Sequence, residues 1–174
     1  MYSLHLNNKN KDQFTLCEDS LTSSVFDLLK YLPDKIFFEI LRRSLFHNKF
    51  EEVPDSLLSI SFWDKWNAEN TSNINYVEPD VFLRFDKFDV IVEAKRNDFH
   101  QQLNGQIDNE IYSYINEYGT EGKQLYFVQV GGIHGTEDEK NIVTSYKGER
   151  VVIMCKTHWS RILDAVIHTR NLTN

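Results

Sequence analysis

Residues 77–95 alternate between apolar and polar side chains with a period of two, and the alternation is interrupted once, at Asp86 and Lys87. A period of two on both sides of a short polar break predicts a β-hairpin, because successive side chains of a strand point to opposite faces. A two-residue turn would place Arg84 opposite Asp89, an opposite-charge pair that favours this register. The segment therefore predicts two neighbouring antiparallel strands and their alignment.

This register brings three charged residues onto one face of the hairpin. Asp80 would lie opposite Glu93 with the β-carbons about 5 Å apart, and Lys95 would follow further along the same face. A three-residue turn would instead place Asp80 opposite Ala94 and disperse the group. Asp-Lys is not the dipeptide that two-residue turns prefer, so the sequence leaves both registers open and the charge pairing favours the first.

Two carboxylates that face each other across a hairpin repel, which is a liability for a sheet with a purely structural role. A bound cation removes the repulsion, and Mg²⁺ prefers hard oxygen ligands, taking one or two carboxylates together with waters and a substrate phosphate. A lysine on the same face could hold an attacking water or stabilise charge that develops on phosphorus. The group therefore indicates metal-assisted phosphoryl chemistry.

The same residues resemble a known family signature. Glu78-Pro79-Asp80 and Glu93-Ala94-Lys95, with 12 residues between Asp80 and Glu93, look like the motif of the PD-(D/E)XK nuclease superfamily, the restriction endonuclease-like fold. The resemblance implies a core of one helix, three antiparallel strands, a second helix and a further strand. It also implies hydrolysis of phosphodiester bonds with Mg²⁺, for which Mn²⁺ could substitute.

The resemblance implies a role for each residue of the motif. Asp80, Glu93 and the backbone carbonyl of Ala94 would bind the metal, and Lys95 would lie beside the attacking water. Some members of the superfamily add an acidic residue from the N-terminal helix, and Glu39 is the candidate here. Basic residues one helical turn away on either side of Glu39 favour a surface ion pair instead.

Three further residues are candidates for substrate binding. Gln106 and Gln102 lie on one edge of the apolar stripe of the next expected helix, and Arg96 follows the motif directly, where it could contact a phosphate. Some superfamily members carry a Gln-x-x-x-Tyr signature on this helix, whereas Gln106 is followed four residues later by Glu110. Glu110 falls within the apolar stripe, which is unusual for a purely structural helix.

The rest of the chain predicts a mixed α/β fold. Helical periodicity covers residues 20–31 and 34–48, a helix capped by Asn97 or Asp98 follows the hairpin, and a C-terminal amphipathic helix has Trp159 at its start. Residues 125–130 and 151–155 are expected to be buried strands. Residues 51–66 are ambiguous, because 57–62 could be a short strand whereas Trp63 and Trp66 have helical spacing. Residues 67–75 and 131–150 are expected to be loops.

We therefore expect one domain over residues 1–174, a central mixed sheet flanked by helices. Residues 1–18 would form a frayed N-terminal arm, residues 19–50 a helical layer, and residues 76–171 the restriction endonuclease-like core.

Composition limits the surroundings and partners of the chain. It has 174 residues, a net charge of −7 and 2 cysteines. The sparse thiols, with no metal-binding spacing, suit a reducing cytoplasm at least as well as a secretory compartment, and no segment resembles a membrane span or a signal peptide. The negative charge argues against nucleic-acid binding through bulk electrostatics, so any polyanion must be held locally.

The leading hypothesis is a magnesium-dependent nuclease that acts on DNA in preference to RNA, in bacterial defence, restriction or repair. A homodimer or a basic partner protein could supply the missing affinity for DNA. The alternative is a non-catalytic module that binds nucleic acid or protein and keeps the nuclease-like fold. Metal-dependent cleavage distinguishes the two hypotheses.

Overall fold

The computed structural model describes residues 18–97, 101–133, 141–146 and 148–172. Its helices are α2 (Glu18–Leu29), α3 (Asp34–Ser44), α4 (Asn104–Tyr118) and α5 (Trp159–Leu172), with a short 3₁₀ helix, η1, at Gly119–Glu121. Its strands are β1 (Leu57–Phe62), β2 (Trp66–Asn67), β3 (Tyr76–Val77), β4 (Val81–Phe85), β5 (Phe88–Ala94), β6 (Gln124–Val130), β7 (Asn141–Tyr146) and β8 (Gly148–Thr157). Within these described ranges, no helix combines the length and the apolar character that a bilayer crossing requires.

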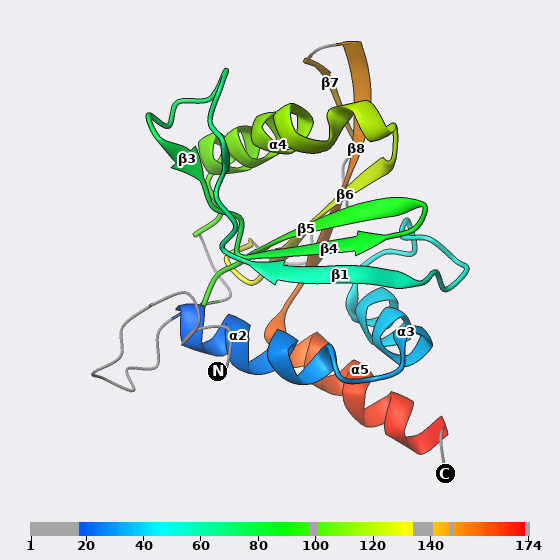
Figure 1. The fold of residues 1–174 in the computed structure, drawn as a ribbon. Helices are drawn as coiled ribbons and strands as arrows, with labels where there is room; N and C mark the ends of the chain where they lie inside the picture. The colour runs from blue at the N-terminus through cyan, green and yellow to red at the C-terminus, as the bar shows by residue number, and fades with distance from the viewer. Residues whose placement is uncertain (1–17, 98–100, 134–140, 147, 173–174) are drawn as a thin grey trace.

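A six-stranded mixed sheet forms the centre of the molecule, in the order β1-β4-β5-β6-β8-β7 (Figure 1). The strands β1, β4 and β5 are antiparallel to one another, β5, β6 and β8 run parallel, and β7 returns antiparallel to β8. The short strands β2 and β3 form a separate antiparallel pair. The predicted mixed sheet flanked by helices is therefore confirmed.

Helices cover both faces of this sheet. The helix α4 lies over one face, and α2, α3 and α5 lie over the other (Figure 1). Because both faces are covered, all seven residues of β5 are buried, as is typical of a central strand in such a sheet. Alternate side chains divide between two apolar clusters: Val90 and Val92 pack toward the three helices, whereas Ile91 packs toward α4.

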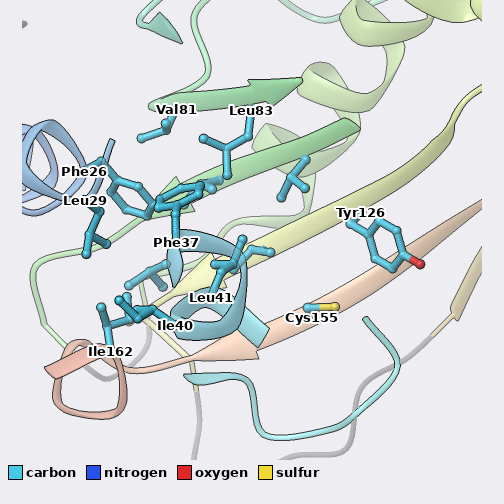
Figure 2. Close-up of a cluster of buried hydrophobic side chains, with 14 of the residues drawn as sticks. Phe26, Leu29, Phe37, Ile40, Leu41, Val81, Leu83, Tyr126, Cys155 and Ile162 are labelled. Atoms are coloured by element: carbon cyan, nitrogen blue, oxygen red, sulfur yellow. The ribbon is translucent and has the colours of Figure 1, made fainter. Parts of the chain in front are cut away.

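The larger cluster lies between the sheet and the three-helix face (Figure 2). Phe38 of α3 is fully buried there, and its ring contacts the rings of Phe50, Phe85 and Phe88 at centroid distances of 5.6, 6.2 and 6.3 Å. Such aromatic contacts contribute beyond the area they bury. This cluster holds α3 against the hairpin that carries the charged motif.

The predicted hairpin register is confirmed. Val81 pairs with Val92 and Arg84 pairs with Asp89, and the turn consists of Asp86 and Lys87. The three-residue turn, which would have dispersed the charged residues, is therefore excluded.

Two sequence expectations were wrong in the same part of the chain. The segment 131–150, expected to be a loop, contains β7 and the first residues of β8. In the described structure β7 pairs with β8 alone, and an edge strand does not need the apolar pattern of a central one. The strand 151–155 was correct in type but too short, because β8 spans Gly148–Thr157.

The helix after the hairpin begins later than expected. Asn97 does not cap it, because α4 starts at Asn104; Asp98 lies outside the described residues. The carbonyl oxygen of Gly132 accepts hydrogen bonds from the amides of Gln101 and Gln102, at 3.0 and 3.2 Å. These amides are satisfied by a turn after β6, so the chain has no need of helical hydrogen bonds there.

Substitution of Phe38 by alanine tests the role of the aromatic cluster. Phe38→Ala should lower the free energy of unfolding by about 3–5 kcal/mol, because it removes a fully buried ring and leaves a cavity among the neighbouring rings. Chemical denaturation monitored by circular dichroism measures the loss. The matched control is Ile74→Ala, at a side chain that is 96% exposed, where the change should stay within about 0.5 kcal/mol.

Candidate active site

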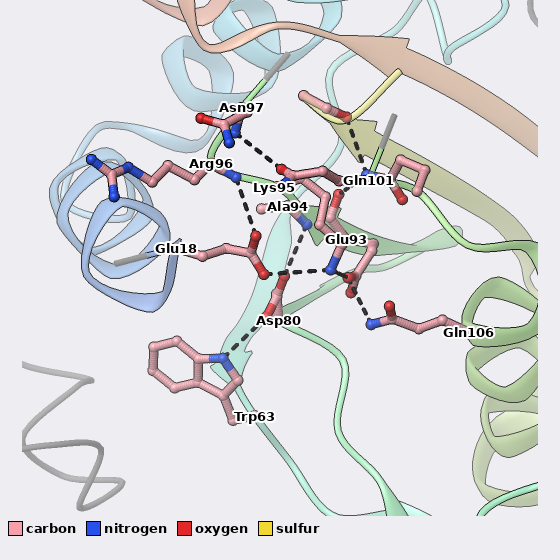
Figure 3. Close-up of polar contacts among 12 residues, drawn as sticks. Glu18, Trp63, Asp80, Glu93, Ala94, Lys95, Arg96, Asn97, Gln101 and Gln106 are labelled. Carbon is pink, nitrogen blue, oxygen red and sulfur yellow. Dashed lines mark hydrogen bonds and ion pairs between the residues drawn. The ribbon is translucent and has the colours of Figure 1, made fainter. Parts of the chain in front are cut away.

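The three predicted site residues meet at the point where β4 begins and β5 ends (Figure 3). Asp80 immediately precedes β4, Glu93 is the penultimate residue of β5, and Lys95 follows β5. The amide of Ala94 donates a hydrogen bond to Oδ2 of Asp80 at 2.9 Å, which joins the two strand ends. Asp80 is 8% exposed and Glu93 1% exposed, so the site is formed by buried carboxyl groups.

Glu93 is the centre of this group. Its Oε1 accepts hydrogen bonds from the ammonium group of Lys95 and from the side-chain amide of Gln106, the latter at 2.7 Å. Its Oε2 is buried, and it has no hydrogen-bond donor among the described residues as long as Glu110 is ionised. Gln106 therefore lies at the site and is bonded to Glu93, and its predicted contact with substrate stays a prediction.

The other predicted substrate-binding residues have different positions. The side-chain amide of Gln102 donates to the backbone carbonyls of Glu93 and Gly131, both at 3.2 Å, so it ties the end of β5 to the turn after β6. Arg96 has an exposed side chain next to the site, and its backbone amide donates to Glu18. A contact of Gln102 or Arg96 with substrate stays a prediction.

The acidic residue from the N-terminal helices is Glu18 instead of Glu39. Oε1 of Glu18 lies 3.4 Å from the Lys95 ammonium, and its Oε2 accepts the Arg96 amide at 3.2 Å. Glu39 bonds Arg42 and Arg43 on its own helix, each at 3.1 Å, as its basic neighbours indicated. Glu18 was expected in a frayed arm; it is the first residue of α2, and no spacing in the sequence links it to the hairpin.

Glu110 also lies beside the site, and its position in the apolar stripe of α4 was the sequence signal for it. It is fully buried, and neither carboxyl oxygen has a hydrogen-bond partner among the described residues when both it and Glu93 are ionised. The two carboxyl groups are within hydrogen-bonding reach, and that bond forms only when one of them carries a proton. Glu110 can thus donate to Glu93 as a neutral acid.

Burial sets the charge state of these acids. Burial, reinforced by the Glu93 carboxylate, raises the pKa of Asp80 and that of Glu110 well above their ordinary values. Burial also raises the pKa of Glu93, although Lys95 opposes the shift. For Lys95, burial alone would lower the pKa, but the neighbouring carboxylates outweigh it and raise the pKa. The cluster therefore contains more buried carboxyl groups than the ammonium of Lys95 can neutralise.

A hard divalent cation fits this donor chemistry. Asp80 and Glu93 would supply oxygen ligands from adjacent strand ends. Among the described residues, no group of three or more histidine, cysteine, aspartate or glutamate side chains has a geometry that could hold a metal ion. Mg²⁺ at this site stays a prediction; it would need only one or two protein carboxylates, because it keeps several waters. The carbonyl of Ala94 as a further ligand stays a prediction.

A pair of glycines after β6 gives Lys95 its space. Gly131 and Gly132 have φ angles of 67° and 65°, which L-residues with side chains rarely adopt. A β-carbon on Gly131 would lie 2.5 Å from the Lys95 carbonyl oxygen, and one on Gly132 would lie 2.7 Å from the Lys95 γ-carbon. The turn must therefore be glycine at both positions for β5 to end where it does.

Gly132→Ala should lower the free energy of unfolding by more than about 1–2 kcal/mol, because the left-handed backbone and the contact with Lys95 both oppose a β-carbon. Urea denaturation of the purified variant measures the change. Gly105→Ala is the matched control, since a β-carbon there meets nothing within 4 Å and the residue lies in α4, so stability should stay equal or rise by up to about 1 kcal/mol. Equal losses in both variants would contradict this account of the turn.

Glu110→Gln should make the metal-free protein relatively more stable as the pH rises. The folded wild type retains a proton on Glu110 at pH values where the unfolded chain has lost it, so wild-type stability falls as pH rises from about 4.5 through the raised pKa. Glutamine mimics the neutral acid and removes this loss, which reaches at most about 1.4 kcal/mol per pH unit. Thermal unfolding in EDTA between about pH 5 and 8 measures the difference.

Glu39→Gln is the control for this pH dependence. Partial burial alone would raise the pKa of Glu39, but Arg42 and Arg43 outweigh it and lower the pKa. The contribution of Glu39 to the free energy of unfolding is therefore lost only as the pH falls below the ordinary pKa of a glutamate. The stability difference between Glu39→Gln and wild type should therefore be flat where that of Glu110→Gln changes. A flat difference for Glu110→Gln as well would show that Glu110 does not retain its proton.

No known family model matches the chain. A protein of Pasteurella multocida (strain Pm70), which bears only the description "uncharacterized", is 32% identical over 165 residues, covering 87% of this chain and 61% of the relative. The chain thus spans about three fifths of the length of the curated relative that it matches. The description of that relative states no activity, so the case for a function depends on the site itself.

Proposed function

We propose that the chain is a magnesium-dependent nuclease of the PD-(D/E)XK type that hydrolyses phosphodiester bonds, with DNA favoured over RNA. The observation that carries the proposal is the convergence of Asp80, Glu93 and Lys95 at adjacent strand ends. The element order supports it: apart from the separate β2–β3 pair between β1 and β4, the order α3, β1, β4, β5, α4, β6 matches the helix, three antiparallel strands, helix and further strand that the resemblance implies. The restriction endonuclease-like core is part of this proposal.

Each residue has a distinct task in the proposed reaction. Asp80 and Glu93 would hold the cation, which supplies Lewis-acid activation of water and neutralises charge on the phosphate. The Lys95 ammonium, now bonded to Glu93, would stabilise the negative charge that develops on phosphorus. Gln106 would keep Glu93 in one orientation through its hydrogen bond.

Charge sets the demands on substrate binding. The chain has a net charge of −7, so an approaching polyanion is repelled unless a local basic surface or a partner offsets the field. A homodimer or a basic partner protein would meet this demand. The second candidate, a non-catalytic binding module, is favoured by one observation: Lys95 already has two carboxylate partners, Glu93 and Glu18, as in a purely structural cluster.

A cleavage assay with paired variants tests the proposal. Linear, circular, branched and single-stranded DNA, together with RNA, are incubated with the protein in Mg²⁺, in Mn²⁺ and in EDTA. We expect cleavage of DNA that depends on the metal, and a loss of roughly a hundredfold or more for Asp80→Asn, Glu93→Gln and Lys95→Met under single-turnover conditions. Lys95→Arg should not restore activity, because a planar guanidinium replaces a compact ammonium.

Glu39→Gln is the matched acid-to-amide control, since the Glu39 carboxylate is engaged with two arginines on its own helix. It should cleave at the wild-type rate. Wild-type cleavage by Lys95→Met would sink the proposed mechanism. Absence of cleavage of every substrate, with Mg²⁺ binding also absent by calorimetry, would favour the non-catalytic module.

A further inference from the structure

We propose that Trp63 is a positioning residue, whose indole N–H holds the Asp80 carboxylate in the orientation in which it binds a divalent cation. Nε1 of Trp63 donates to Oδ1 of Asp80 at 3.2 Å (Figure 3). The inference rests on the proposed function, because the cation is the one proposed for that site. Sequence spacing gave no sign of this contact, since Trp63 and Asp80 are 17 residues apart on different elements.

The backbone of Trp63 is adapted to this contact. Trp63 directly follows β1 and has a φ of 52°, in the left-handed region that a bulky residue rarely enters. Such a conformation costs of order 1–3 kcal/mol and persists where surrounding contacts impose it, which is most often at functional sites. Here the Trp63 amide donates to the carbonyl of Pro79 at 3.1 Å, and the side chain is 4% exposed. Trp63 is thus hydrogen-bonded to Asp80 through its indole and to Pro79, the residue before Asp80, through its backbone amide.

Asp80 is held at both of its carboxylate oxygens. The Ala94 amide donates to Oδ2 and the Trp63 indole donates to Oδ1, so the plane of the carboxylate is fixed from two elements. Each oxygen has a second lone pair, which remains available for a cation. Without the indole, one oxygen would lose its partner and the carboxylate could rotate. Outer hydrogen bonds of this kind typically contribute 10–100-fold to metal affinity.

The chain offers internal comparisons, because it has 3 tryptophans. The indole of Trp159 donates to the backbone carbonyl of Lys95 at 2.9 Å, so it fixes the end of the strand without contacting a carboxylate. The indole N–H of Trp66 is buried and has no hydrogen-bond partner among the described residues. Its ring packs edge-on against Phe82 at a centroid distance of 4.8 Å. Trp66→Phe therefore removes the same atoms as Trp63→Phe but no contact with the site.

Nuclear magnetic resonance of the ¹⁵N-labelled full chain reads each indole N–H separately. Three indole signals are expected and are assigned from the loss of one signal in each Trp→Phe variant. When MgCl₂ is added to the wild type, the Trp63 signal should shift with the same dependence on concentration that calorimetry gives for Mg²⁺ binding. The Trp66 signal should stay unchanged.

Calorimetry of the variants supplies the second readout. Trp63→Phe should bind Mg²⁺ about 10–100-fold more weakly than wild type, whereas Trp66→Phe should match wild type within about twofold. A thermal melt in EDTA identifies any general loss of stability. If Trp63→Phe does not fold, the Trp63 signal of the wild type still decides the matter.

The outcomes separate this inference from the proposed function. Mg²⁺ binding that leaves the Trp63 signal unmoved, or that is equally tight in Trp63→Phe, overturns the positioning role alone. A shifted Trp63 signal without cleavage of any nucleic acid supports the positioning role and overturns the nuclease. A wild type that binds no Mg²⁺ overturns the metal site and the positioning role together.

Discussion

Burial of several carboxyl groups at one point is the constraint on which the rest of the structure depends. Asp80, Glu93 and Glu110 are each at most 8% exposed, and the Lys95 ammonium is hydrogen-bonded to Glu93. Ionised groups are costly to remove from water unless they are paired. Two features of the fold reduce this cost. Each acid has a raised pKa, which favours its neutral form. The carboxyl oxygens also accept hydrogen bonds from the Ala94 amide, the Gln106 side chain, the Trp63 indole and the Lys95 ammonium. A divalent cation would complete the compensation.

The arrangement of the sheet and its helices determines which groups surround the buried acids. Because β5 is covered on both faces, Glu93 is surrounded by protein, and its hydrogen bonds come from Gln106 of α4 and from Lys95 and Gln102, which follow β5. The paired glycines after β6 allow Lys95 to lie close to the sheet while its ammonium reaches Glu93. The site is therefore a product of close packing between neighbouring elements.

Local patterns made part of this molecule predictable. The hairpin register, and with it the convergence of Asp80, Glu93 and Lys95, followed from alternation over residues that are near in sequence. Glu18 and Trp63 were not predictable, because each reaches the site through tertiary contacts that leave no periodic signal. The late start of α4 and the strand β7 were missed for a related reason: backbone groups were satisfied by distant partners, and an edge strand carries a weak pattern.

The parallel pairing of β5 with β6 has a consequence for how the protein acquires its site. The two strands are joined through α4, so their pairing is a contact between distant parts of the chain, which forms late and slowly compared with a hairpin. Lys95 reaches its observed position only when its own backbone amide donates a hydrogen bond to the carbonyl of Val130, at the end of β6. A nascent chain that ends before β6 can form the hairpin but not the completed cluster. The acidic residues thus acquire their raised pKa values only once the whole sheet has closed around them.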